Sequence, residues 1–195
     1  MPLRLADIDM LIVPGWANSD ADHWQSRWQR RMPHARRIQQ AEWEKPMIGD
    51  WVTRIVEAVA AATRPAVLVA HSLGVPAVVH AASLVDRRKV AGAFLVAPTD
   101  LELTDAAWTE PGGFWPAVEG GFHPVPSAPL PFPSVVIASN NDPYVELETA
   151  RGYALDWGAD FADAGASGHI NAASGHGPWP EGLLRLGMFL QRLPK

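Results

Sequence analysis

Short apolar runs alternate along the chain with longer segments in which apolar residues recur every three or four positions. The runs are rich in Val, Ile and Leu, which is typical of the buried strands of a parallel sheet. Four of them stand out: 10–13, 66–70, 93–96 and 135–138. Residues 160–163 predict a short last strand, and residues 36–40 predict a polar strand at the sheet edge.

The segments between these strands show the periodicity of amphipathic helices. Trp24, Trp28 and Met32 recur at four-residue spacing, and the apolar residues of 48–59 follow the pattern of an amphipathic helix. Further helices are predicted for residues 75–82, 143–157 and 183–190. This alternation indicates an α/β fold, a three-layer α/β/α sandwich in which helices cover both faces of a mostly parallel sheet. Ligands of such sheets bind at the carboxyl ends of the strands, so we expect the chemistry in the loops that follow them.

The composition narrows the class of protein. A chain of 195 residues, 48% of them hydrophobic, is large enough for one domain, residues 1–195, and leaves little room for a second. The net charge of −5 disfavours nucleic acid and membrane surfaces as partners. The lack of cysteine excludes disulfides, thiol catalysis and thiolate metal sites. No segment has the apolar length of a membrane span or the layout of a signal peptide, so we expect a cytoplasmic protein.

A nucleophile elbow is the most specific chemical signal. The run 66–70 leads directly into the sequence HSLG (71–74) and then into a predicted helix. In an elbow, a serine sits on a strained turn between strand and helix, with small residues two positions before and after it. Ala70 and Gly74 are the small residues here. Ser72 is therefore the candidate nucleophile, and the alternative is that it only caps the helix.

The elbow also predicts where an oxyanion would be stabilised. The backbone N–H of Leu73 follows the nucleophile at the start of a helix, so it is the expected first donor. The loop after the first strand reads Pro14-Gly15-Trp16. Because Gly15 allows a close approach of the backbone, the N–H of Trp16 is the expected second donor.

A serine hydroxyl needs a base, and in this architecture an acid and then a histidine follow the nucleophile along the chain. Asp142 comes after the fourth apolar run and is the candidate acid, although it could instead cap a helix that starts at Pro143. Asp100 is the second choice. His169 and His176 both precede the last helix, and position alone does not separate them. No His, Asp or Glu cluster has the spacing of metal ligands.

With these residues placed, the chain resembles a known family, the small serine hydrolases related to retinoblastoma-binding protein nine. The resemblance rests on four segments in the same order: PGW followed by HWQ (14–16, 23–25), AHSLG (70–74), NDPY (141–144) and GHIN (168–171). It implies a compact, lidless α/β-hydrolase fold with Ser72 as nucleophile, Asp142 as acid and His169 as base. It thereby favours His169 over His176. The mechanism needs neither a metal nor an organic cofactor.

Residues 111–133 interrupt the alternation with seven prolines and four glycines, interleaved with aromatic residues. A segment of this kind forms either the wall or cap of a pocket or a loop packed on the surface. Phe114 and Trp115, together with Trp16, are candidates for an apolar acyl pocket. Each of the three could equally pack in the core or on the surface.

The sequence thus favours a serine hydrolase, a carboxylesterase that transfers the acyl group of a small or medium ester to water. Its partner is a small-molecule substrate, and a protein partner is not indicated. The rival interpretation is a binding or scaffold protein that keeps the fold and a vestigial triad. A dinucleotide-binding protein shares the alternation but needs a glycine-rich loop after the first strand, where this chain has only Gly15.

Overall fold

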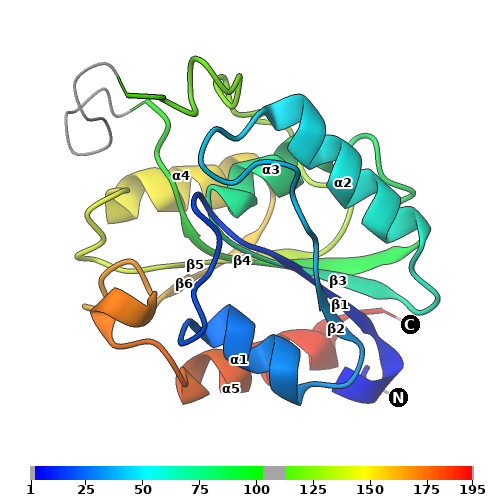
Figure 1. The fold of residues 1–195 in the computed structure, drawn as a ribbon. Coiled ribbons are helices and arrows are strands. Elements are labelled where there is room, and N and C mark those ends of the chain that lie inside the picture. The colour runs from blue at the N-terminus through cyan, green and yellow to red at the C-terminus, as the bar shows by residue number, and fades with distance from the viewer. Residues whose placement is uncertain (1–2, 103–112, 195) are drawn as a thin grey trace.

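The computed structural model describes residues 3–102 and 113–194 (Figure 1). Within these residues, six parallel strands form one sheet in the order β2-β1-β3-β4-β5-β6. Their bounds are β1 Asp9–Val13, β2 Ala35–Arg37, β3 Ala66–Ser72, β4 Val90–Pro98, β5 Ser134–Ala138 and β6 Asp160–Asp163. Each strand overlaps one that the sequence predicts, including the two short strands at the edges.

Helices cover both faces of this sheet. One face carries α1 and α5, and the other carries α2, α3 and α4 (Figure 1). Their bounds are α1 Trp24–Arg31, α2 Ile48–Ala60, α3 Gly74–Ala81, α4 Leu147–Asp156 and α5 Pro180–Arg192, with short 3₁₀ turns η1 Leu5–Asp7 and η2 Ala172–Ser174. This arrangement confirms the three-layer α/β/α sandwich.

The two-residue period of the strands divides the core into two apolar layers. In β1, Leu11 and Val13 pack with α2 and α3, whereas Met10 and Ile12 pack with α1 and α5. All four side chains are almost completely buried. Because both faces are covered, the central strands consist of continuous apolar runs, without the polar alternation of a half-exposed sheet.

One helix begins later than the sequence predicts. The predicted start was Pro143, but α4 begins at Leu147, and the intervening residues form a turn after β5. In this turn, the N–H of Tyr144 donates a hydrogen bond of 2.9 Å to Oδ1 of Asp142. Asp142 therefore closes a short turn and does not cap the helix, which leaves its carboxylate able to accept from another partner.

The proline-rich segment packs on the core beside α2 and α3; its first two residues, 111 and 112, lie outside the described part of the chain. Phe122 is fully buried, and its ring centroid lies 5.6 Å from that of Trp51 in α2. Nε2–H of His80 in α3 donates to the carbonyl of Phe122 at 2.9 Å. Residues 113–133 are thus an ordered covering of one helical layer.

The connections of β1 and β3 diverge, and this places the site. The chain leaves β1 towards α1 on one face and leaves β3 towards α3 on the opposite face (Figure 1). Two neighbouring parallel strands whose connections run to opposite faces leave a crevice between their carboxyl ends. Ser72, the last residue of β3, lies at this crevice.

Candidate active site

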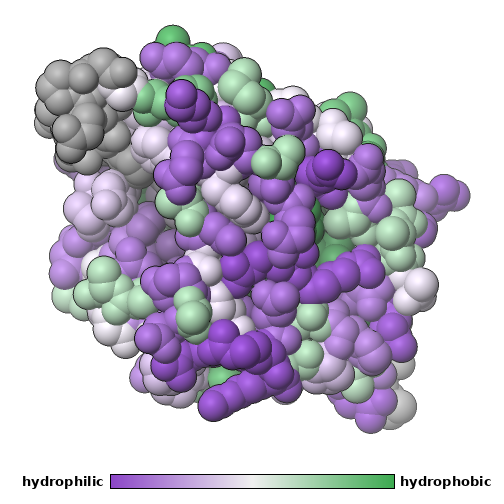
Figure 2. Space-filling model, viewed as in Figure 1, coloured by the Kyte–Doolittle hydropathy of each residue, from purple (hydrophilic) through white to green (hydrophobic). Residues whose placement is uncertain are grey.

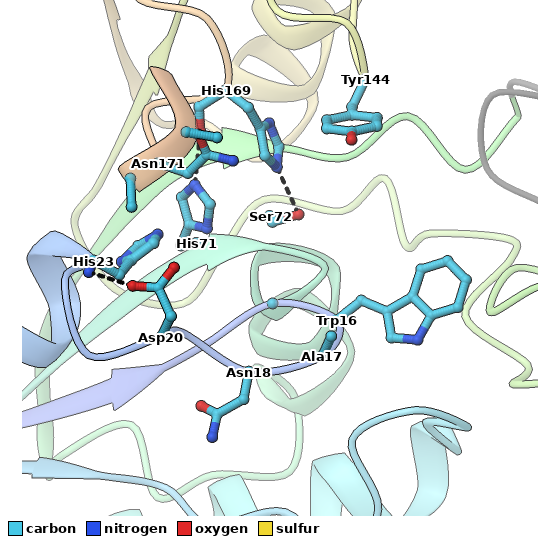
Figure 3. A pocket seen from close by; sticks show the side chains of 13 residues that line it. Trp16, Ala17, Asn18, Asp20, His23, His71, Ser72, Tyr144, His169 and Asn171 are labelled. Carbon is cyan, nitrogen blue, oxygen red and sulfur yellow. Dashed lines mark hydrogen bonds between the residues drawn. The ribbon is translucent and has the colours of Figure 1, made fainter. Parts of the chain in front are cut away.

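A cavity of about 340 Å³ opens at the carboxyl ends of β1 and β3 (Figure 3). Its walls come from four regions that are distant in sequence: the loop between β1 and α1, the end of β3, the turn after β5 with Tyr144, and the segment around η2 that precedes α5. Ser72 and His169 both line the cavity, and the ring of Tyr144 stands beside His169 with a centroid distance of 4.5 Å. Figure 2 shows one face of the molecule, on which hydrophilic side chains predominate and apolar ones are scattered among them.

Three of the residues that the sequence proposes for catalysis form one continuous hydrogen-bonded chain. Nδ1 of His169 lies 2.9 and 3.0 Å from the two carboxylate oxygens of Asp142, and Nε2 lies 2.9 Å from Oγ of Ser72. The carboxylate is fully buried and only accepts, so Nδ1 carries the proton. The lone pair of Nε2 therefore faces Ser72, whose hydroxyl donates to it, as a general base requires.

The backbone of the elbow explains the small residues around Ser72. Ser72 has a φ of +55°, a left-handed conformation that is costly for a residue with a Cβ. A Cβ at Gly74 would lie 2.5 Å from the carbonyl oxygens of Val13 and Pro14, and a Cβ at Gly15 would lie 2.7 Å from Cβ of Ser72. Both glycines are therefore required by close packing between the elbow and the loop after β1.

The two expected oxyanion donors flank Ser72. Leu73 is the residue that precedes the first turn of α3, so its N–H belongs to the positive end of that helix. Gly15 packs closely against Ser72. Trp16, the next residue, lines the cavity. The indole Nε1–H of Trp16 donates to the carbonyl of Glu44 at 2.9 Å, which fixes the orientation of the ring. Figure 3 shows the ring projecting from the loop on the side away from Asp20 and His23.

The other residues weighed for these roles lie elsewhere. Phe114 and Trp115 are not among the described residues that line the cavity, and Trp115 packs against the core layer of α2 and α3. Oδ1 of Asp100 accepts from the N–H of Glu102 at 2.9 Å. Nδ1 of His176 is 3.2 Å from a serine hydroxyl in η2, and the structure brings neither Asp100 nor His176 to Ser72.

Two side chains that the sequence did not single out hold the loop of His169. Nε2–H of His71 donates to the carbonyl of His169 at 2.8 Å, and Nε1–H of Trp24 donates to the carbonyl of Ile170 at 2.9 Å. Ile170 has a φ of +46° and is fully buried. A β-branched residue in this region is strained by about 1–3 kcal/mol, so the two donors stabilise a conformation that the loop would otherwise avoid.

Burial keeps both imidazoles next to this loop neutral. Burial lowers the pKa of His71 well below its ordinary value, and the neighbouring His23 and His169 lower it further. Burial likewise lowers the pKa of His23 to about 4. Nδ1 of His23 accepts from the N–H of Gln25, and its ring packs against that of His71 with a centroid distance of 4.7 Å. Neutral His71 has a single N–H, which lies on Nε2 and donates to the carbonyl of His169.

Thr99 is a further contact of Ser72, the candidate nucleophile. It follows β4, is almost completely buried, and places Oγ1 at 3.1 Å from Oγ of Ser72. Because the Ser72 hydroxyl donates to His169, the Thr99 hydroxyl is the donor in this pair. No motif marks this threonine in the sequence, since the contact depends on the pairing of β3 with β4.

Within residues 3–102 and 113–194, no three His, Asp or Glu side chains gather in an arrangement that could hold a metal ion. In the same part of the chain, no helix has the length and apolar character needed to cross a membrane.

Comparison with known families places this site in context. The family model described as serine hydrolase matches residues 10–188, a span that includes Ser72, Asp142 and His169. The chain belongs to the serine hydrolase family. A search of curated proteins gives no match.

Solved structures agree with this family. A crystal structure described as a YdeN-like hydrolase of Pectobacterium atrosepticum shares 35% identity with this serine hydrolase, covers 96% of this chain and 94% of that one, and superposes with a TM-score of 0.81. The ydeN gene product of B. subtilis shares 19% identity over 92% of this chain and 97% of that one, with a TM-score of 0.67. A type II thioesterase, BorB of the borrelidin cluster, shares 16% identity over 97% and 94%, with a TM-score of 0.64. The last two show the common α/β-hydrolase fold.

Proposed function

We propose that this serine hydrolase is a carboxylesterase that transfers the acyl group of small or medium esters to water through Ser72, His169 and Asp142. The observation that carries the proposal is the hydrogen bond of 2.9 Å between the Ser72 hydroxyl and Nε2 of His169, at the wall of an open cavity. A binding protein of the same fold would have no need of a base aimed at a strained serine.

The reaction follows from this geometry. Ser72 Oγ attacks the ester carbonyl while Nε2 of His169 accepts its proton, and Asp142 stabilises the resulting imidazolium. The backbone N–H groups of Leu73 and Trp16 stabilise the oxyanion. His169 then returns the proton to the leaving alcohol. Water, deprotonated by the same nitrogen, attacks the carbonyl of the acyl-enzyme. Its bond to Ser72 Oγ then breaks, His169 returns the proton to that oxygen, and the acid leaves.

Structures that share the fold support acyl transfer. One neighbour, Est1E of Butyrivibrio proteoclasticus, is described with ferulic acid bound, and another is described as a type II thioesterase. Their low identity to this chain leaves ester, thioester and amide substrates to be separated by experiment. Of the three residues expected to form an acyl pocket, Trp16 is the one among the described residues that line the cavity.

Labelling with a fluorophosphonate probe tests the proposal, because the probe reacts only with an activated serine. We expect one adduct on the purified protein, located at Ser72 by mass spectrometry and absent from Ser72→Ala. Hydrolysis of p-nitrophenyl butanoate should fall by roughly 10⁴-fold or more in the same variant. Folded protein that takes up no label would refute the esterase assignment.

A matched pair of histidine variants tests the assignment of His169 as the general base. His169→Ala should lose labelling and turnover to a similar extent, because no other imidazole contacts Ser72 in the described part of the chain. His176→Ala is the control, since it removes an imidazole from the adjoining loop that does not line the cavity. The opposite pattern would transfer the role of base to His176.

A further inference from the structure

The cavity beside Ser72 contains a carboxylate that the proposed mechanism does not use. Asp20 lies in the loop between β1 and α1 and lines the cavity (Figure 3). Its Oδ1 accepts hydrogen bonds of 2.8 Å from the N–H groups of Asp22 and His23. Within the described residues, its Oδ2 has no hydrogen-bond partner, and Figure 3 shows this oxygen directed towards His71 and the cavity. The backbone thus fixes the carboxylate in an orientation that presents one oxygen to a ligand.

No positive side chain balances this charge. Among the described residues that line the cavity there is no lysine or arginine. The nearby guanidinium of Arg37 is bound elsewhere, with Nη1 at 2.6 Å from Oδ1 of Asn18 and at 3.0 Å from the carbonyl of Ser19. It forms no ion pair with Asp20 within the described chain. The cavity wall therefore carries an uncompensated negative charge.

The remaining polar groups of the wall leave this imbalance unchanged. The imidazoles of His23 and His71 are neutral at ordinary pH because burial lowers the pKa of both. The other lining side chains, such as Asn18 and Asn171, form hydrogen bonds without carrying charge. Asp20 is therefore the only residue with a carboxylate among the described residues that line the cavity.

We infer that this cavity selects substrates by charge. It accepts esters whose acyl or alcohol portion carries a positively charged nitrogen, tolerates neutral ones, and disfavours those with a carboxylate or sulfonate. The inference concerns the proposed Ser72 site and rests on the proposed function. A cation near Oδ2 of Asp20 gains attraction that an isosteric neutral group lacks, and an anion at the same place meets repulsion in addition to losing its hydration.

A series of three esters of matched shape measures this effect. The probes are p-nitrophenyl butanoates that end in a trimethylammonium, a tert-butyl or a sulfonate group. We expect kcat/KM to fall in that order, with about a 10-fold difference between the cationic and the anionic ester, because Asp20 is exposed and screened by water. Added salt should narrow the difference, as it does for exposed charges. Equal kcat/KM values, or a preference for the sulfonate, would overturn the inference.

Two matched variants assign the effect to one carboxylate. Asp20→Asn keeps an oxygen that accepts from the N–H groups of Asp22 and His23 but removes the charge, so the three kcat/KM values should converge. Asp22→Asn removes the same charge from a side chain that pairs with Arg27 and does not line the cavity, and it should preserve the difference. An Asp20→Asn enzyme that keeps the wild-type order would overturn the inference.

The outcomes separate this inference from the proposed function. If Ser72 takes up the fluorophosphonate and the neutral ester is hydrolysed without any charge preference, only the inference fails. If Ser72 takes up no label, the proposed function fails, and the charge preference fails with it as a property of catalysis.

Discussion

At the scale of single residues, the position of the proposed base, His169, depends on two side chains that hydrogen-bond to the carbonyls of its loop. Ile170 adopts a left-handed conformation directly after His169, and indole and imidazole donors hold the two carbonyls of this loop. Rotation of either peptide would move Nε2 of His169 away from Ser72. His71 and Trp24 are therefore positioning residues.

Removing the His71 donor should lower catalysis without weakening substrate binding. In His71→Leu we expect kcat to fall by roughly 10–100-fold, with KM little changed and fluorophosphonate labelling slowed in parallel. His71→Gln restores an N–H donor in the same direction and should recover part of the loss. If Leu and Gln behave alike, the role of His71 is packing and not hydrogen bonding.

The sequence could predict three candidate residues that the structure brings together, Ser72, Asp142 and His169, but not the residues that position them. Ser72 carries a local signature, because the elbow requires Gly74 beside it whatever surrounds it. His71 and Thr99 act through contacts between segments that are distant along the chain, at 2.8 and 3.1 Å. No local pattern encodes such contacts. The aromatic character of Phe114 and Trp115 suggested a pocket, whereas neither is among the described residues that line the cavity.

At the scale of elements, apolar periodicity predicts the strands well where both faces of the sheet are buried. It predicts the start of a helix less well where the same residues can also form a turn. Residues 160–163 were predicted as a strand and form β6 with the same bounds. The start of α4 was predicted too early, because Pro143 is favoured in the first turn of a helix. The hydrogen bond from the N–H of Tyr144 to Oδ1 of Asp142 closes a separate turn first. This turn is local, and an aspartate followed by proline favours a turn as well as a helix start, so periodicity alone does not decide between them.

The junction of β3 and α3 has no space for a side chain at Gly74. Gly74→Ala should lower the free energy of unfolding by roughly 1–3 kcal/mol, because the new Cβ forces the end of β1 away from the elbow. Gly187→Ala in α5 is the control: among the described residues, no atom beyond the local helix backbone lies within 4 Å of the place its Cβ would take. A gain of about 0.5–1 kcal/mol is therefore expected there. Urea unfolding of both variants measures the two effects, and a neutral Gly74→Ala would contradict the packing argument.

At the scale of the whole molecule, the buried imidazoles link stability to pH. The pKa of His23 is about 4 in the folded protein, against 6.5 for an ordinary histidine side chain, and that of His71 is lowered in the same direction. Below about pH 6.5, the unfolded chain binds protons that the folded protein does not. The free energy of unfolding must therefore decrease as the pH falls through this window.

Between neutral pH and about pH 4, we expect His23 alone to lower the free energy of unfolding by about 3 kcal/mol. Urea unfolding at both pH values measures this as a shift in the midpoint. His23→Asn keeps an acceptor for the N–H of Gln25 and removes the imidazole, so its stability should depend less on pH. The quantity compared is the difference in the free energy of unfolding between the two pH values, so any loss of packing that does not depend on pH cancels. If the variant keeps the wild-type pH dependence, His23 is not a source of the pH dependence of stability.

The parallel sheet also separates the ends of the described chain from the cavity. Residues 3–8 precede the amino end of β1, and Leu193 packs against Gly92 near the amino end of β4, whereas Ser72 lies at the opposite, carboxyl edge. A protein attached to a solid support through either end would therefore hold the mouth of its cavity towards the liquid. Immobilised in this way, the molecule should remain open to dissolved esters.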